Sequence, residues 1–281
     1  MSKILVVANQ KGGVGKTTTA VNLSASLAAT KRKVLMVDLD PQGNATMGCG
    51  IDKHDLELSL YDVLTAKCDI SAAIVTSANA GFDVVPTNSD LTAAEVELMD
   101  MPNRESRLST ALEEVSADYD YIIIDCPPAL SMLTINAMVA AQGVLIPMQC
   151  EYYALEGLSA LMQTIEKIKT KLNPELEIEG ILRTMYDPRN SLTTDVSTQL
   201  ITHFGDKVYS TVIPRNVRLA EAPSYGLPVL AYDKNSRGAV AYLALAGEMN
   251  RRTKSKKSAA KKNSTNKAVG STAGKKAISQ A

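Results

Sequence analysis

Short runs of β-branched and aliphatic residues alternate along this chain with longer stretches in which apolar residues recur every three or four positions. The short runs are typical of buried strands, and the longer stretches of amphipathic helices. The pattern predicts strands at 3–9, 33–37, 82–86, 119–125, 143–148, 177–183 and 208–213, and helices at 16–30, 104–116, 131–141, 154–172, 193–204 and 237–251. Strands almost continuous in Val, Ile and Leu, with helices between them, indicate an α/β fold, a mostly parallel twisted sheet with helices on both faces.

The last 31 residues have a different composition from the rest. Residues 251–281 carry ten Lys or Arg and no Asp or Glu, although the whole chain has 30 of each class. The preceding 250 residues therefore hold 20 basic and 30 acidic residues, a net charge of −10. With Val269 and Ile278 as the only larger aliphatic residues, the tail buries too little surface to offset its ordering entropy. We expect a folded domain over 1–250 and a disordered, Lys-rich tail over 251–281 that either binds DNA or only solubilises the protein.

Several classes of protein are excluded by what the chain lacks. No run of 18 apolar residues is present, and the five apolar residues after Lys3 lead into a glycine-rich loop rather than a cleavage site. The four cysteines form no C-x-x-C pair, which argues against a disulfide framework or a zinc site. These features predict a cytoplasmic protein with no membrane contact.

A glycine-rich segment follows the first predicted strand and leads into the first predicted helix. Asn9–Thr19 reads Asn-Gln-Lys-Gly-Gly-Val-Gly-Lys-Thr-Thr-Thr. Its three glycines let successive backbone N–H groups point at one anion, and the helix dipole adds to that attraction. In such a P-loop, Lys16 reaches the β- and γ-phosphates and the Thr17 hydroxyl ligates Mg²⁺. The expected nucleotide-binding residues here are Lys11, Gly12, Gly13, Val14, Gly15, Lys16, Thr17 and Thr18.

Carboxylates stand at the ends of two predicted strands. Asp38 and Asp40, two residues apart, can both point toward the phosphate site at the carboxyl edge of the sheet. Asp125 ends a fully apolar strand, the position of a Mg²⁺-binding acid. The alternatives are a solvated strand end for the first two and a helix N-cap for Asp125, although Pro127 and Pro128 favour a tight strand exit.

The histidines and tyrosines suggest no further catalytic site. His54 and His203 lie in polar surroundings, so we expect them at the surface, and no Ser-His-Asp arrangement is apparent. Tyr152 and Tyr153, at the start of a long predicted helix, are expected to be packing residues.

One departure from the standard P-loop points to a family. Gln10 stands where the strict pattern has its first glycine, and a second lysine, Lys11, lies within the loop. This segment resembles the deviant Walker A motif of the ParA/Soj partitioning ATPases, relatives of MinD and the nitrogenase iron protein. The resemblance covers about residues 1–250 in ordered blocks, which are Asn9–Thr19, Val37–Asn44, Tyr121–Pro128, Gln149–Gly157 and Val212–Ser224.

The resemblance assigns roles to particular residues. It implies that Lys11 reaches the nucleotide of a partner protomer, that Asp40 positions the attacking water, and that Asp38 is a second-sphere or switch residue for Mg²⁺. It places adenine beside Met185 and beside Pro214, Arg215 and Asn216. It also implies that Arg189 and Arg218 contact DNA without sequence preference, whereas a lone surface arginine is usually a solvated charge.

The resemblance further implies a P-loop NTPase fold and a Mg²⁺-dependent ATPase that acts as an ATP-dependent homodimer. Such a dimer binds double-stranded DNA non-specifically, associates with the nucleoid, and is released when a ParB-type centromere-binding protein stimulates hydrolysis, which segregates or positions replicons. Two alternatives remain at this stage. One is a MinD-like ATPase that positions something other than DNA, and the other is a nucleotide-gated DNA-binding regulator of replication initiation.

Overall fold

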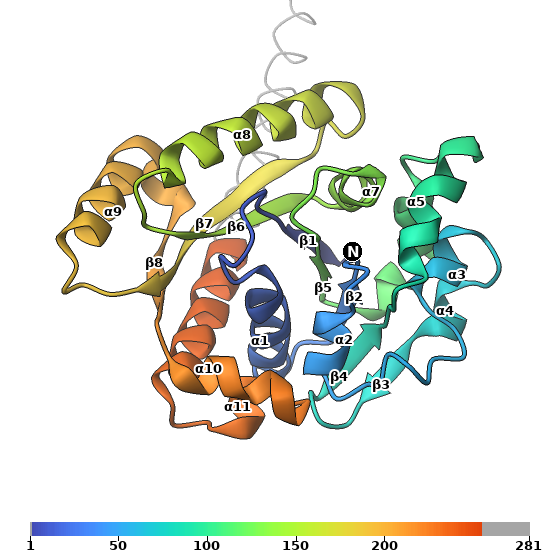
Figure 1. Cartoon of the computed structure of the whole chain (residues 1–281), viewed down its shortest axis with the longest axis horizontal. Helices are drawn as coiled ribbons and strands as arrows, with labels where there is room; N and C mark the ends of the chain where they lie inside the picture. Colours follow the sequence, from blue (N-terminus) through green and yellow to red (C-terminus); the bar gives the residue numbers. More distant parts are fainter. Residues whose placement is uncertain (1, 255–281) are drawn as a thin grey trace, which may run out of the picture.

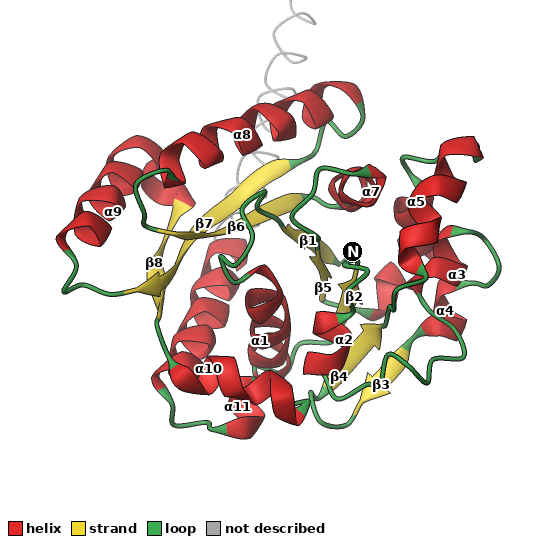
Figure 2. Cartoon of the chain, viewed as in Figure 1, coloured by secondary structure: helices red, strands yellow, loops and turns green. Residues whose placement is uncertain are grey.

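A computed structural model describes residues 2–254, which form one eight-stranded sheet with helices on both faces (Figures 1 and 2). The strands are β1 (Lys3–Val7), β2 (Val34–Asp38), β3 (Val75–Ser77), β4 (Phe82–Val85), β5 (Tyr121–Asp125), β6 (Gly143–Gln149), β7 (Glu177–Tyr186) and β8 (Val208–Pro214). Their order is β3-β4-β2-β5-β1-β6-β7-β8, and every pair is parallel except β3 with β4. The predicted α/β fold is confirmed.

Helices follow most strands and return the chain to the opposite edge. The α-helices are α1 (Lys16–Ala29), α2 (Asn44–Gly48), α3 (Leu60–Leu64), α4 (Ile70–Ala73), α5 (Leu91–Asp100), α6 (Arg107–Val115), α7 (Met132–Ala140), α8 (Ala154–Lys171), α9 (Ser191–Phe204), α10 (Val217–Glu221) and α11 (Val229–Tyr232). Short 3₁₀ turns occupy Ser116–Asp118, Gly205–Lys207 and Ala222–Tyr225. A further helix is described over residues 237–254.

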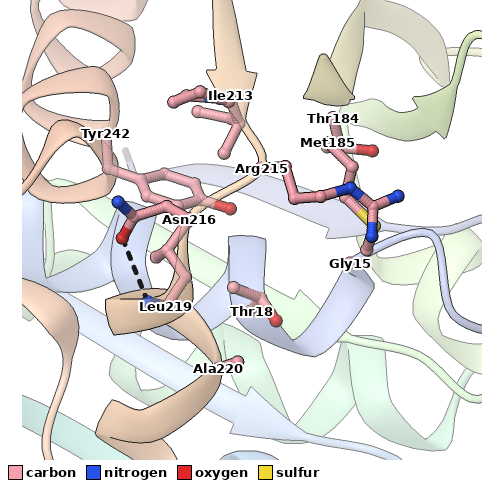
Figure 3. Close-up of a pocket in the computed structure, with 11 residues that line it drawn as sticks. Gly15, Thr18, Thr184, Met185, Ile213, Arg215, Asn216, Leu219, Ala220 and Tyr242 are labelled. Atoms are coloured by element: carbon pink, nitrogen blue, oxygen red, sulfur yellow. Dashed lines mark hydrogen bonds between the residues drawn. The ribbon is translucent and has the colours of Figure 1, made fainter. Parts of the chain in front are cut away.

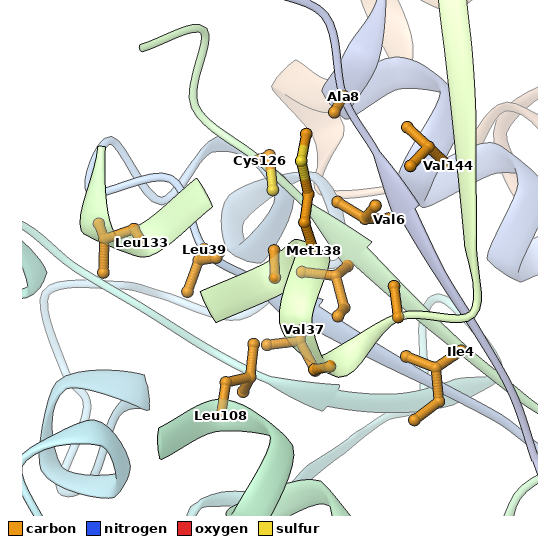
Figure 4. Packing of buried hydrophobic residues seen from close by; sticks show 14 of the residues in the cluster. Ile4, Val6, Ala8, Val37, Leu39, Leu108, Cys126, Leu133, Met138 and Val144 are labelled. Carbon is orange, nitrogen blue, oxygen red and sulfur yellow. The ribbon is translucent and has the colours of Figure 1, made fainter. Parts of the chain in front are cut away.

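The alternation of side chains along each strand divides the core into two layers. In β1, Ile4 and Val6 face a cluster built with helices α3 to α9, which Figure 4 shows around Val37 and Met138. Leu5 and Val7 face the opposite cluster, built with α1, α10, α11 and the helix over 237–254. Both faces of the central strands are thus covered, which explains why their sequences are apolar without alternation.

The predicted elements are present with ends shifted by a few residues, whereas the ten-residue α5 and the shorter elements were not predicted individually. Strand β7 extends three residues beyond the predicted 177–183, because β6 pairs with it as far as Gln149 opposite Thr184 and β8 as far as Pro214 opposite Tyr186. Helices α2, α3, α4, α10 and α11 have only four or five residues, too few for a helical period to show in the sequence.

The predicted boundary between the domain and the tail at residue 251 needs correction. Residues 251–254 continue the last helix, and two of them pack on the body. The Arg252 guanidinium donates to the carbonyls of Asp206 (2.7 Å) and Val208 (2.9 Å) and stacks 4.2 Å from the centre of the Tyr209 ring. Thr253 hydrogen-bonds to Lys3 Nζ (3.1 Å). The remainder of the predicted tail, 255–281, lies outside the described residues.

Candidate functional site

The glycine-rich loop leaves β1 at the carboxyl edge of the sheet and ends at the first turn of α1. Gly13 and Gly15 have φ values of +72° and +88°, which favour glycine, and they turn the chain into the helix. A β-carbon built on Gly12 or Gly13 would meet no atom within 4 Å, so this side of the loop is open. An open loop at the N-terminus of a 14-residue helix is suited to binding an anion.

Lys16, the first residue of α1, turns its side chain back over this loop. The residue is buried, and Nζ donates to the Lys11 carbonyl at 3.2 Å. Burial lowers the pKa of the Lys16 ammonium, and the nearby Asp125 and Asp40 carboxylates oppose that shift. A cation buried among carboxylates beside an open loop is positioned to meet phosphate oxygens.

Two aspartates end adjacent strands in register, since Asp38 of β2 pairs with Asp125 of β5. Asp38 is fully buried, and its Oδ2 accepts hydrogen bonds from the Thr46 backbone N–H and hydroxyl, each at 2.7 Å. Burial raises the pKa of Asp38 to about 6. Burial, reinforced by the Asp38 charge, raises the pKa of Asp125 well above its ordinary value. Neither Asp125 carboxylate oxygen makes a hydrogen bond of good geometry among the described residues, although the Thr17 hydroxyl lies close enough to oppose the rise in the Asp125 pKa.

The donor set around Asp125 fits a divalent cation. Two buried carboxylate oxygens without partners are costly in an apolar interior unless a ligand neutralises them. Asp125 and the half-buried Thr17 supply the hard oxygen atoms that Mg²⁺ prefers, with Asp38 fixed behind them by Thr46. Of the three predicted metal-site residues, the structure thus gives Asp38 its own protein partners and leaves Asp125 open.

Asp40 lies on the loop after β2, partly exposed. Its backbone N–H donates to Asp38 Oδ1 (3.2 Å), and its Oδ1 accepts from the Gln42 N–H (3.0 Å). The Asp40 carboxylate also opposes the lowering of the Lys16 pKa, so the two charged groups lie near each other. This position agrees with a residue that acts at the phosphate site.

A cavity of about 270 Å³ opens beside the N-terminus of α1 (Figure 3). It brings together all four residues that were expected beside the base, Met185, Pro214, Arg215 and Asn216. Sequence reasoning missed the other walls, which are Thr184, Ile213, Leu219, Ala220 and Tyr242. Because Gly15 and Thr18 also line the cavity, it is continuous with the phosphate loop, as an adenosine site must be.

The second lysine of the loop is exposed and ion-paired. Lys11 Nζ lies 2.5 Å from Glu151 Oε2, and each side chain is about half exposed. Glu151 was not predicted, although it stands in one of the blocks that carry the family resemblance. Tyr152 and Tyr153, expected to pack in the core, are instead 73% and 72% exposed. The prediction failed because they lie in the turn before α8, whose buried face begins only at Ala154.

The two predicted DNA-contacting arginines are accessible, and both are held by carboxylates. Arg189 is 88% exposed at its side chain and donates to both oxygens of Asp187, at 2.9 and 2.7 Å. These hydrogen bonds lower the pKa of Asp187 to about 2. Arg218 is half exposed, 2.8 Å from Glu221 and 3.4 Å from Asp233.

The chain is similar in sequence to known proteins over most of its length. Residues 2–178 match the family described as AAA domain. The chain is 54% identical to the sporulation initiation inhibitor protein Soj of Bacillus subtilis, over 89% of this chain and 98% of that protein. It is 52% identical to the chromosome partitioning protein ParA of Caulobacter vibrioides, over 88% and 93%.

A solved structure supports the same fold. The crystal structure of cobyrinic acid a,c-diamide synthase from Mycobacterium smegmatis, with bound ADP and magnesium, superposes with a TM-score of 0.80. The two sequences are 38% identical, and the match covers 91% of this chain and 96% of that one. Within residues 2–254, no helix is both long and apolar enough to cross a membrane.

Proposed function

Because the chain belongs to the ParA/Soj family of partitioning ATPases, we propose that it segregates or positions replicons through an ATP-driven cycle of DNA binding and release. The chain is a P-loop ATPase that uses ATP and Mg²⁺. The observation that carries the proposal is the carboxyl edge of the sheet. There an open anion-binding loop, the buried Lys16 and the Asp125 carboxylate lie at the ends of the strands, and a cavity of about 270 Å³ shares Gly15 and Thr18 with the loop and the first turn of α1.

Each residue at this edge has a physical task in the reaction. The loop N–H groups and Lys16 bind the triphosphate and neutralise charge that develops during transfer. Thr17 and Asp125 would hold Mg²⁺, which would supply further neutralisation of the phosphate charge. Asp40, tied to Asp38 through its backbone N–H, orients the attacking water. Met185, Pro214, Arg215 and Asn216 enclose the base.

Dimerisation requires Lys11 to change partners. In the single protomer Lys11 pairs with Glu151. We place Lys11 on the partner's nucleotide in the ATP-bound dimer, where its charge meets phosphate instead of carboxylate. An exposed ion pair contributes only about 0–1 kcal/mol, so a triphosphate can displace Glu151.

DNA binding by the dimer accounts for the exposed arginines on an acidic body. Residues 1–250 carry a net charge of −10, so contact with phosphates needs local basic groups. Arg189 and Arg218 supply them, and a ParB-type centromere-binding partner stimulates hydrolysis and thereby release. This cycle places the protein on the nucleoid whenever it holds ATP.

The test measures hydrolysis and DNA binding together. We expect the ATPase rate to rise when double-stranded DNA and the partner are both present, compared with either alone. Arg218→Glu should reduce ATP-dependent DNA binding at least tenfold while leaving ATP affinity unchanged, because Arg218 lies outside the cavity. Arg237→Glu, an exchange of the same charge on the last helix, is the matched control. DNA binding of equal strength with ATP, with ADP and without nucleotide would contradict the proposal.

A further inference from the structure

One contact joins the phosphate loop to the wall of the base cavity. Thr184, near the end of β7, donates its hydroxyl to the Val14 carbonyl at 2.8 Å. Both residues are buried, at 3% and 1% exposure, and they are 170 positions apart in the chain. Thr184 and Gly15 both line the cavity, as Figure 3 shows. The contact therefore lies between the place for the base and the place for the phosphates.

The direction of this hydrogen bond constrains the loop. The Val14–Gly15 peptide is trans, so its C=O and N–H groups point in opposite directions. When Thr184 fixes the Val14 carbonyl, it also fixes the Gly15 N–H on the other side of the peptide plane. This peptide would rotate about ψ of Val14 and φ of Gly15, and Gly15, which has no side chain and a φ of +88°, offers little resistance on its side.

The alternative orientation of the Val14–Gly15 peptide would weaken anion binding by the loop. Rotation would direct the Val14 carbonyl oxygen at the bound anion in place of an N–H group, and that oxygen carries partial negative charge. Without Thr184 the loop would have to bear this cost, or order itself only as phosphate binds. With Thr184, one orientation is favoured before any ligand arrives, which is the meaning of preorganisation.

The next residue connects the same strand end to the base. Met185 has a left-handed φ of +49°, uncommon for a residue other than glycine, and its sulfur accepts a hydrogen bond from the Gln149 side chain. Met185 lines the cavity beside Thr184. The end of β7 thus shapes the base cavity with one residue and the phosphate loop with its neighbour.

We propose that Thr184 is a positioning residue that sets the Val14–Gly15 peptide of the phosphate loop for triphosphate binding. It acts through Val14 and does not itself touch the reacting atoms. This inference rests on the proposed nucleotide site and identifies the residue on β7 that keeps the loop ready for phosphate.

The experiment separates the phosphates from the base. Calorimetric titration of the full chain with inorganic tripolyphosphate, with adenosine and with ATP, each with Mg²⁺, is carried out on the wild type and on Thr184→Val. The variant keeps the shape of the side chain and leaves the buried carbonyl without its donor. We expect affinity for tripolyphosphate and ATP to fall about tenfold and affinity for adenosine to change less than twofold. Thr184→Ser, which restores the hydroxyl, should recover wild-type affinity for all three.

Controls distinguish positioning from general damage. Thr193→Val removes another buried hydroxyl that faces a backbone carbonyl, that of Cys150, and should leave tripolyphosphate affinity unchanged. If Thr184→Val fails to fold, Thr184→Ala is titrated instead, with the same expected pattern. Equal losses for adenosine and tripolyphosphate, no loss for either, or no recovery in Thr184→Ser would each overturn the positioning role. If the wild type itself binds no ATP, the proposed function fails together with the inference.

Discussion

Buried charged residues lie at both the carboxyl and the amino edge of the central sheet, but they differ in how far other protein groups neutralise them. At the carboxyl edge Lys16 is buried with a lowered pKa, and Asp125 has two buried oxygens without a hydrogen-bond partner in the described chain. At the amino edge Lys3 lies 2.7 Å from the buried Glu179. There, Glu248 accepts from the backbone N–H groups of Ser210 and Thr211, each at 2.9 Å.

The amino edge is closed by the same helix that ends the described chain. Arg252 lies 2.8 Å from Glu248 and donates to two backbone carbonyls, so the charges there satisfy one another. At the amino edge the buried charges are balanced by protein groups, whereas at the carboxyl edge a ligand is needed to balance them. Charges at the amino edge stabilise the free protein, whereas those at the carboxyl edge would cost free energy until the proposed phosphate and metal ligands bind.

The largest expected effect is on ATP affinity, and it distinguishes Lys16 at the carboxyl edge from Lys3 at the amino edge. Lys16→Ala should weaken ATP binding by at least 100-fold, because the triphosphate loses its buried counter-charge. Lys3→Ala, the same exchange at the amino edge, should leave ATP affinity within twofold and lower the free energy of unfolding by about 1–3 kcal/mol. Titration with a fluorescent ATP analogue and urea unfolding measure the two quantities. An equal loss of ATP affinity in both variants would remove the distinction between the edges.

A second test concerns the cost of the unpartnered carboxylate. Because folding raises the pKa of Asp125, the folded ligand-free protein holds this proton more tightly than the unfolded chain does. The free energy of unfolding therefore falls as the pH rises above the unfolded pKa of about 3.9. Asp38, with a pKa of about 6, adds a loss between about pH 4 and 6. Asp125→Asn should therefore make the ligand-free protein about 2 kcal/mol more stable at pH 8 and change its stability little near pH 4.

Urea unfolding at the two pH values, with and without Mg²⁺ and ATP, measures this difference. The wild type should gain stability from Mg²⁺ with ATP, and Asp125→Asn should lose most of that gain. Asp55→Asn, which replaces an exposed acid outside the site, is the matched control. A less stable Asp125→Asn protein at pH 8 would show that the carboxylate is not a cost in the free state.

The smallest expected effects are on the stability of two truncated chains, which end before and after the helix turn that packs on the amino edge. Ending the chain after Asn250 removes the Arg252 and Thr253 contacts and should lower the free energy of unfolding by about 2 kcal/mol. Ending it after Lys254 keeps the Arg252 and Thr253 contacts and should lower stability less than ending it after Asn250 does. The second truncation removes the seven lysines of 255–281, so it isolates their contribution to DNA binding.

That contribution should be independent of nucleotide. If the lysines meet phosphates, truncation after Lys254 weakens DNA binding equally with ATP, with ADP and without nucleotide. It also flattens the salt dependence by roughly 0.9 per phosphate released. DNA titrations over a series of salt concentrations give the slope. An unchanged slope would assign the lysines to solubility and leave the DNA contact to the folded arginines.

Seven of the eight strands in the described chain, most of the longer helices and the phosphate loop could be predicted because each is encoded locally, whereas the three-residue β3 and the ten-residue α5 were not predicted. Val, Ile and Leu runs mark β1 and β5, and three glycines before a lysine mark the loop. The end of the domain was misplaced because Arg251–Lys254 looks like the start of a basic tail. Only the fold reveals that Arg252 stacks on Tyr209.

The missing parts of the site depend on contacts between distant segments. Thr184 and Tyr242 have no motif of their own, and they join the cavity because β7 and the last helix both reach α1. Glu151 lies 140 positions from Lys11, so its pairing is invisible in sequence.

The carboxylate partners of the two exposed arginines bear on how the protein would move over DNA. Arg189 is held by Asp187, and Arg218 by Glu221 and Asp233. A phosphate that binds either arginine replaces an existing ion pair, so the net gain per contact is the difference between two similar attractions. Each contact is then weak and quickly exchanged, and neighbouring phosphates along the duplex compete on nearly equal terms. If Arg189 and Arg218 contact DNA as proposed, the acids would favour a protein that stays on the duplex yet passes readily from one site to the next.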